Sequence, residues 1–200
     1  MLRFGTTRER LAVVREMVEQ IEPKEAIIVM KMFAGEEDRV RWGLIRVLGD
    51  LKIRAATPMI MNELKNPYHR ECAIEALGKI GAEESFYPLR DFLAQNPESA
   101  MIALLPLART GRQKSLKYLR PYLSHEMATV RQAAVRALET VETPECLKVL
   151  KDCMLQERDD RVRGAFRQSI RTLESALQAI EARLQGTATV SLEDKTIELG

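Results

Sequence analysis

The chain has 200 residues, which suits one domain with a substantial core or one array of small units. Its charges are balanced, with 31 Lys and Arg against 29 Asp and Glu, so the net charge of +2 favours no class of partner. No stretch approaches the roughly 20 apolar residues that cross a bilayer, and the charged N-terminus is unlike a secretory signal. We therefore expect a cytoplasmic protein with no membrane association.

Residues 1–35 predict a pair of helices that covers the end of a stack. Thr6 or Thr7 can cap a first helix, and Glu22-Pro23 predicts a turn before a second helix within "KEAIIVMKMF". The open end of a helical array would otherwise expose its apolar face. We interpret this pair as a degenerate N-terminal cap.

A half-basic, half-apolar helical segment recurs along the rest of the chain, in steps of 29, 30, 31 and 32 residues. Periods of this length indicate stacked helix–turn–helix units. One apolar column of the first helices comprises Leu48, Leu77, Leu107, Leu138 and Ile170. The second helices carry apolar stripes at Phe86, Leu89 and Leu93, at Leu116, Leu119 and Leu123, and at Leu147, Leu150 and Met154, with a looser match at Ile60 and Leu64.

The phrases "DRVRWGLIRVLGDL", "HRECAIEALGKIGAEESFYPLRDFL" and "MATVRQAAVRALETV" resemble HEAT repeats of the short bacterial type also found in phycobilisome lyases. The resemblance covers residues 36–175. It implies an all-α fold, a right-handed α-solenoid of about five helix pairs. We expect one domain at 1–185, with the cap at 1–35 and the repeats at 36–185.

Two repeats depart from this pattern. The third carries Pro106 inside its first helix, which predicts a kink. The fifth lacks the glycine turn, so its second helix can run on from the first through "LESALQAIEARLQ". Beyond it, residues 186–200 alternate polar and apolar side chains, which predicts short strands, although two isolated strands are marginal in water. This tail is thus expected to be β-forming or disordered, to fold back, or to pair with a second chain as a homodimer.

An arginine column lies seven residues before the leucine column, at Arg41, Arg70, Arg131 and Arg163. It could form a ladder for anions. In HEAT arrays such arginines bridge neighbouring units, often through an acid such as Asp38 or Asp160, so the resemblance favours a structural role. Residues at fixed places in a repeat report packing before they report binding.

A basic band is predicted on the second helices. These helices line the concave surface of HEAT solenoids, so an acidic protein segment could bind there. The alternative is a solvated helix face that happens to be basic. The band consists of Tyr87, Arg90, Lys114, Lys117, Arg120, Lys148 and Lys151.

Trp42 is the only tryptophan, and its column elsewhere holds no large aromatic residue. It is either a partly exposed anchor for a partner or a residue covered by the N-terminal helices. The second interpretation is favoured, because large aromatic side chains are generally buried.

No catalytic constellation is visible in the sequence. The two histidines, His69 and His125, fall in turns and lack a neighbouring ligand at metal-binding spacing. The three cysteines have the character of reduced, mostly buried side chains. We expect no enzyme activity, no metal and no cofactor.

The leading hypothesis is a non-catalytic scaffold or adaptor that binds a protein partner on the concave surface. One alternative is nucleic-acid binding similar to the HEAT-like DNA glycosylases, which the basic band favours and the low net charge opposes. A phycobilin lyase-like protein is the other, and it rests on the resemblance of the repeats alone.

Overall fold

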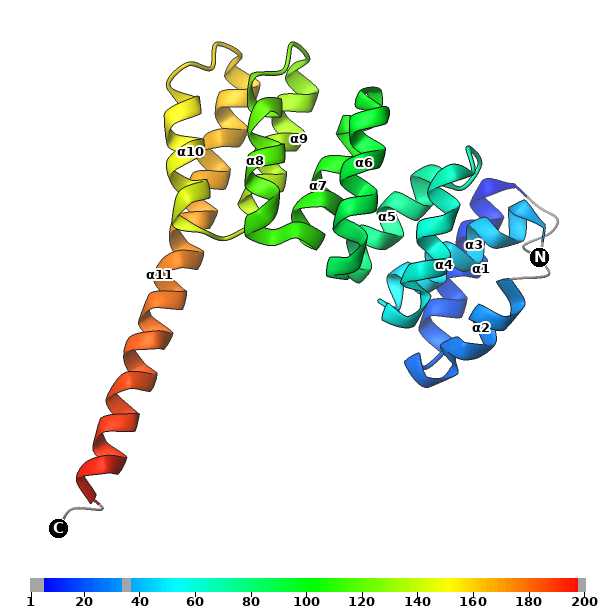
Figure 1. Ribbon diagram of the computed structural model, residues 1–200, viewed down its shortest axis with the longest axis horizontal. Helices are drawn as coiled ribbons and strands as arrows, with labels where there is room; N and C mark the ends of the chain where they lie inside the picture. The colour runs from blue at the N-terminus through cyan, green and yellow to red at the C-terminus, as the bar shows by residue number, and fades with distance from the viewer. Residues whose placement is uncertain (1–5, 34–36, 198–200) are drawn as a thin grey trace. The chain divides into compact units, whose positions relative to one another are not determined.

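The computed structural model describes residues 6–33 and 37–197, which form helices joined by short turns (Figure 1). This described part contains no strand, so the all-α prediction is confirmed. Short 3-10 turns precede or follow several of the helices. The α-helices are α1 (Thr7–Gln20), α2 (Ala26–Phe33), α3 (Asp38–Asp50), α4 (Thr57–Asn62), α5 (Arg70–Ile80), α6 (Phe86–Gln95), α7 (Ala100–Gly111), α8 (Leu116–Leu119), α9 (Ala128–Glu139), α10 (Pro144–Met154) and α11 (Asp160–Ile197).

The chain divides into two compact units, Met1–Leu119 and Arg120–Gly200. In the first, the first helices α3, α5 and α7 pack in sequence, and α4 and α6 pack on α5 and α7 as second helices. The predicted cap is confirmed, because α1 and α2 both pack on α3. In the second unit, α11 packs on α9 and α10. The helix pairs form an α-solenoid, as predicted, while a single domain at 1–185 stays a prediction.

The predicted apolar columns form the core. Leu48, Leu77, Leu107 and Leu138 are fully buried, and Ile170 is 8% exposed. Burying one leucine contributes about 1.5–3 kcal/mol, so a column that recurs in every repeat is a large part of the stability. A matching position on the second helices, twelve residues further along each repeat, is also fully buried; it holds Ile60, Leu89, Leu119 and Leu150.

The sequence offers Thr6 and Thr7 as candidate N-cap residues of the first helix. Thr6 is the N-cap of α1, and its Oγ1 accepts the backbone N–H of Glu9 at 3.3 Å. Glu9 Oε2 in turn accepts the backbone N–H of Thr6 at 2.6 Å, which completes a capping box.

The turns within the first four repeats each contain one residue in the left-handed region. Gly81 has φ of 65°, and Lys52, Arg112 and Glu142 have φ of 54°, 47° and 53°. Gly111 comes one residue before Arg112 and meets a different constraint, because a Cβ there would lie 2.3 Å from the Phe86 ring. Left-handed residues reverse the chain without continuing the helix.

Small residues let the first helices approach closely. A Cβ added to Gly49 would lie 2.6 Å from Ala76 Cβ, and one added to Gly78 would lie 2.8 Å from Pro106 Cβ. At the corresponding place between α9 and α11, the Ser169 hydroxyl donates a hydrogen bond to the Glu139 carboxylate. Neighbouring first helices therefore meet through closely packed small residues in the first unit and through a side-chain hydrogen bond in the second.

The second helix of the third repeat differs from the prediction of one regular helix. It consists of a 3-10 turn at Arg112–Ser115, α8, and another 3-10 segment at Arg120–Ser124. Pro121 has no N–H to donate, so the α-helical ladder ends there. Lys114 and Arg120 therefore do not share an α-helical arc with Lys117.

The C-terminal segment differs from the strand prediction. α11 continues to Ile197, past the ends of α9 and α10 (Figure 1). Two strands that do not belong to a larger sheet are only marginally stable in water. Extending a helix whose first half is already packed, by contrast, adds one backbone hydrogen bond per residue. Residues 198–200 lie outside the described part of the chain.

Candidate functional site

Four residues of the predicted basic band lie in the first unit, and three of them meet around Tyr118. The Arg90 guanidinium carbon lies 4.9 Å from the Tyr87 ring centroid and 5.8 Å from that of Tyr118. Lys117 Nζ lies 4.8 Å from the Tyr118 ring centroid. Cation–π contacts of this kind contribute about 0.5–1 kcal/mol at exposed sites. We call Tyr87, Arg90, Lys117 and Tyr118 the α6–α8 cluster.

Buried packing holds the two tyrosine rings of this cluster in place. Phe86 is 1% exposed, and its ring meets those of Tyr87 and Tyr118 edge to face, with centroids 5.1 and 5.7 Å apart. Gly111 leaves room for the Phe86 ring. Tyr87 is 54% exposed, so the cluster presents an aromatic surface on a rigid base.

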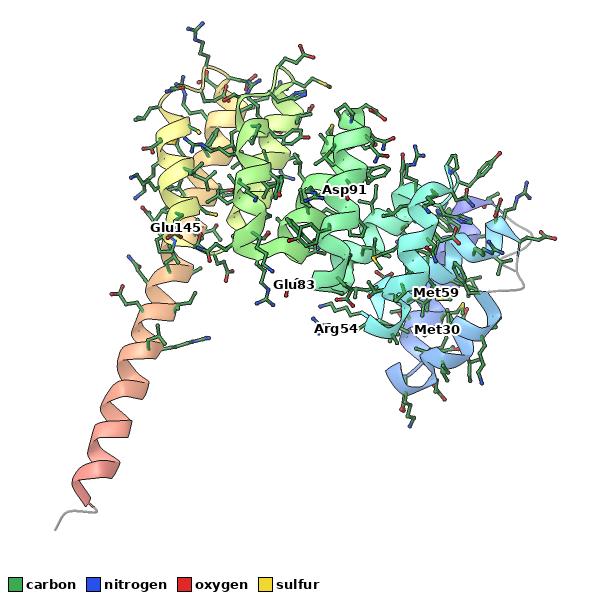
Figure 2. The ribbon with its side chains drawn as sticks, viewed as in Figure 1. Met30, Arg54, Met59, Glu83, Asp91 and Glu145 are labelled. Atoms are coloured by element: carbon green, nitrogen blue, oxygen red, sulfur yellow. The ribbon has the colours of Figure 1, made fainter. Side chains whose placement is uncertain are left out.

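Acidic residues neutralise part of the band. Asp91 Oδ1 accepts hydrogen bonds from Arg90 Nε at 2.8 Å and from Nη2 at 2.5 Å. Lys114 forms an ion pair with Glu83. Figure 2 labels both acids, with Asp91 on α6 and Glu83 on the turn before it. In the described chain, Lys117 forms no ion pair with an acid, so it is the least compensated cation of the cluster.

The cluster also shifts the acid–base properties of its members. Hydrogen bonding from Arg90, and then from Lys117, holds the pKa of the Tyr118 phenol below its usual value. Hydrogen bonding to Asp91 raises the pKa of Arg90. Arg90 therefore stays charged at neutral pH next to aromatic surface.

The other three predicted residues, Arg120, Lys148 and Lys151, lie in the second unit. All three are exposed, and Lys151 forms an ion pair with Glu174 at 2.6 Å. Whether the seven residues act as one site stays a prediction. Sequence reasoning left Tyr118 outside the band, and it missed the compensating acids, although Asp91 directly follows Arg90.

Trp42 is half-buried, and the Arg46 guanidinium carbon lies 5.3 Å from its ring centroid. Arg46 continues into an ion-pair network between α3 and α5, through Glu75 at 3.0 Å. Lys79 joins Glu75 at 2.6 Å and Asp50 at 2.7 Å. Burial by itself would raise the pKa of Glu75. Hydrogen bonds and charges from Lys79 and Arg46 nevertheless hold this pKa below its usual value. Trp42 thus borders a structural network, and a role as an anchor stays a prediction.

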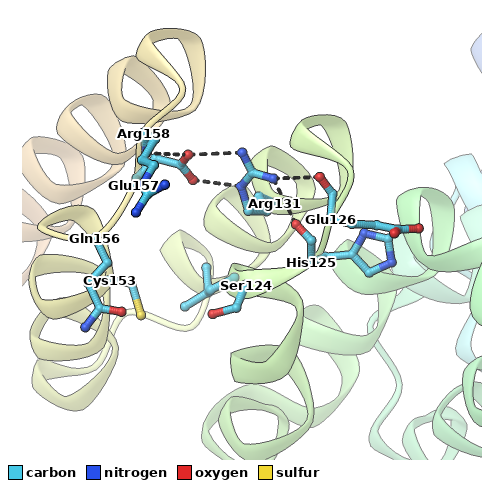
Figure 3. Close-up of a pocket in the computed structure, with 9 residues that line it drawn as sticks. Ser124, His125, Glu126, Arg131, Cys153, Gln156, Glu157 and Arg158 are labelled. Atoms are coloured by element: carbon cyan, nitrogen blue, oxygen red, sulfur yellow. Dashed lines mark hydrogen bonds and ion pairs between the residues drawn. The ribbon is translucent and has the colours of Figure 1, made fainter.

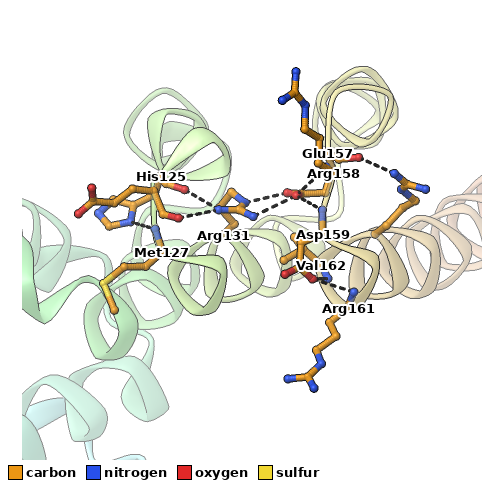
Figure 4. Close-up of polar contacts among 10 residues, drawn as sticks. His125, Met127, Arg131, Glu157, Arg158, Asp159, Arg161 and Val162 are labelled. Atoms are coloured by element: carbon orange, nitrogen blue, oxygen red, sulfur yellow. Dashed lines mark hydrogen bonds and ion pairs between the residues drawn. The ribbon is translucent and has the colours of Figure 1, made fainter.

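Three of the four arginines of the column bridge successive repeats, as the structural interpretation predicted, whereas Arg41 lies 3.9 Å from Glu63 of its own repeat. Arg70 Nε donates to the Leu64 carbonyl at 3.4 Å, and Arg163 Nη2 donates to the Glu157 carbonyl at 2.9 Å. Arg131 Nη1 donates to the carbonyls of His125 and Glu126, at 2.8 and 2.9 Å (Figure 4). Each accepting carbonyl belongs to the end of the preceding repeat.

The second unit contains a pocket of about 400 Å³ between the ends of its repeats (Figure 3). Arg131 and Glu157 point toward each other across it, with contacts of 2.7 Å from Nε and 3.0 Å from Nη2. Glu157 Oε1 also accepts the backbone N–H groups of Arg158 and Asp159. Arg131 and Glu157 are thus paired with each other, and this pair serves the structure.

The histidine and cysteine side chains of the described residues are mostly buried in the core. No group of three or more His, Cys, Asp or Glu side chains among them could hold a metal ion. His69 is fully buried between Glu63 and the Asp38 carbonyl, which makes it a core residue. Burial raises the pKa of the Cys72 thiol to about 12, and it also raises the pKa of Cys146 and Cys153. These thiols are therefore protonated at neutral pH and poor nucleophiles.

Comparison with protein families identifies the family to which these repeats belong. The family model for HEAT repeats matches residues 26–104 and again residues 94–171. The chain belongs to the HEAT-repeat family. A search of curated proteins gave no match.

Membership of the HEAT family fits what the structure shows of the chain. The matched residues run from α2 into α11, so they include the helices that carry the basic band. HEAT repeats generally act as scaffolds for protein–protein interactions and are typically non-catalytic. Among the described helices, none is long and apolar enough to cross a membrane.

Proposed function

We propose that this HEAT protein is a non-catalytic adaptor that binds an acidic segment of a protein partner at the α6–α8 cluster. The observation that carries the proposal is the Arg90 guanidinium between the rings of Tyr87 and Tyr118 on an exposed face. Tyrosine and arginine are the residue types that most often dominate binding energy at protein interfaces.

The contacts within the cluster support a preorganised site. Phe86 fixes both tyrosine rings, and Asp91 fixes Arg90 from one side. Side chains that are already ordered lose less conformational entropy when a partner binds. A carboxylate of the partner would reach Lys117 directly and would compete with Asp91 for Arg90.

The same acids oppose nucleic-acid binding. Asp91 and Glu83 repel phosphate groups, and they compensate two of the four cations that α6, α8 and the turn before α8 contribute here. Affinity for nucleic acid grows with the number of phosphates that cations neutralise. A partially compensated, aromatic surface suits a protein segment better.

The test is a pull-down from native extract with the intact chain and two charge-reversed variants. The first combines Arg90→Glu with Lys117→Glu. The matched control combines Arg39→Glu with Arg109→Glu, which are exposed residues of first helices and give the same change in charge. Circular dichroism checks that each variant retains its helices, and nuclease treatment removes proteins bridged by nucleic acid.

We expect a protein that is retained by the wild type and by the control, and lost by the Arg90→Glu, Lys117→Glu variant. Retention of the same proteins by all three forms would contradict the proposal. Loss of every protein after nuclease treatment would instead indicate a nucleic-acid ligand.

A further inference from the structure

α11 carries an apolar stripe that matches the second helices of the other repeats. The buried position of the second helix follows the column leucine by twelve residues in four repeats, from Leu138 to Leu150 in the fourth, for example. In α11, Ile180 follows Leu150 by 30 residues, which is one repeat step. Leu177 and Leu184 lie at the same step from Leu147 and Met154. Residues 174–184 therefore have the pattern of a fifth second helix.

This stripe is not buried as its counterparts are. Leu150 is fully buried, whereas Ile180 is 40% exposed and Leu184 is 66% exposed. The same face of α11 is buried earlier in the helix, where Phe166 and Leu173 are fully buried in the second unit. The exposed stripe thus continues a face that is already packed.

The fifth repeat lacks the two residues that reverse the chain in the others. In the second repeat, Gly81 in the left-handed region and Ala82 in an extended conformation separate Ile80 from the second helix. In the fifth, Leu173 corresponds to Ile80, and Glu174 follows it directly within α11. From Ile170 to Ile180 the spacing is ten residues instead of twelve. Without the turn, residues 174–184 cannot fold back on their own first helix.

We propose that a second copy of this chain covers the stripe. The two α11 helices lie antiparallel, and residues 174–184 of each copy occupy the place of the missing second helix on residues 160–173 of the other. Shortening a hinge between two elements is a recognised route to such an exchange, and the reciprocal contact closes as a twofold dimer.

The charges near this surface are compatible with the exchange. α10 presents Lys148 and Lys151 as exposed residues, and Lys151 already pairs with Glu174. The segment that would lie beside α10 brings the exposed Glu181. The proposal goes beyond the adaptor function, because it uses α11 and not the α6–α8 cluster.

The test measures the molar mass of the full chain by light scattering over a range of concentrations. We expect the wild type to form a dimer at high concentration. Ile180→Glu places a charge on the stripe and should give a monomer. The matched control Ala182→Glu adds the same charge to an exposed position on the opposite side of α11 and should remain a dimer.

A second variant restores the missing turn. Inserting Gly-Ala after Leu173 recreates the spacing of the second repeat, so the stripe can pack within its own chain and the protein should become a monomer of unchanged helicity. A wild type that stays monomeric at every concentration would overturn the proposal. So would a dimer that survives Ile180→Glu as well as Ala182→Glu, or one that survives the insertion.

Discussion

Individual polar side chains join one repeat of this HEAT protein to the next, and Glu157 is the clearest example. Its side chain is 5% exposed, and both carboxylate oxygens accept hydrogen bonds from Arg131. Its carbonyl accepts a hydrogen bond from Arg163 of the following repeat. One residue thus connects α9, α10 and α11. The sequence showed the arginines but not this acid, because Glu157 lies in a turn with no repeat column of its own.

Glu157 makes the stability of the second unit depend on pH. Hydrogen bonding from Arg131 holds the pKa of Glu157 below its usual value. A carboxylate with a lowered pKa stabilises the fold above its unfolded value of about 4.3, and this stabilisation is lost as the pH falls through the folded value. Glu157→Gln should cost about 1–3 kcal/mol near neutral pH, with a smaller cost below about pH 4.

Urea unfolding of both forms at several pH values measures this difference. Glu84→Gln removes an exposed acid and serves as the control, with little effect at any pH. A cost for Glu157→Gln that is the same at pH 7 and pH 3 would show that its charge does not contribute.

At the scale of elements, the sequence predicts helices well where packing repeats and poorly where a single residue decides. The leucine columns and the N-terminal cap are confirmed, because apolar periodicity determines which face is buried. The second helix of the third repeat breaks at Pro121, and α11 continues where alternation favoured strands. In the third repeat, the apolar spacing alone does not take account of Pro121, which lacks the N–H that an α-helix needs. In the tail, the alternating pattern alone does not take account of the packed helix that precedes it.

Two glycine substitutions test the packing of the first helices, with opposite signs. Gly49→Ala would place a Cβ 2.6 Å from Ala76 Cβ, so α3 and α5 must separate, at a cost of about 1–3 kcal/mol. Gly164 lies in α11 with nothing within 4 Å of an added Cβ. Gly164→Ala should therefore stabilise the protein by about 0.5–1 kcal/mol, the usual difference in helix propensity. Thermal unfolding measures both, and equal effects of the two substitutions would contradict the close contact.

For the whole molecule, the repeats explain why the sequence specifies a fold more clearly than a site. A column that recurs in each helix pair identifies the core, whereas a binding surface depends on which side chains meet in space. The sequence grouped seven residues in one band, and three of them meet around Tyr118 in the first unit. The acids that compensate them became apparent only from the contacts.

Hydrogen exchange of the intact chain, alone and with a partner retained in the pull-down, tests the adaptor function most directly. We expect the partner to slow exchange mainly in α6 and α8, since these helices carry the α6–α8 cluster, with little change in α3. Exchange that slows only in first helices, or only in α11, would contradict binding at this cluster.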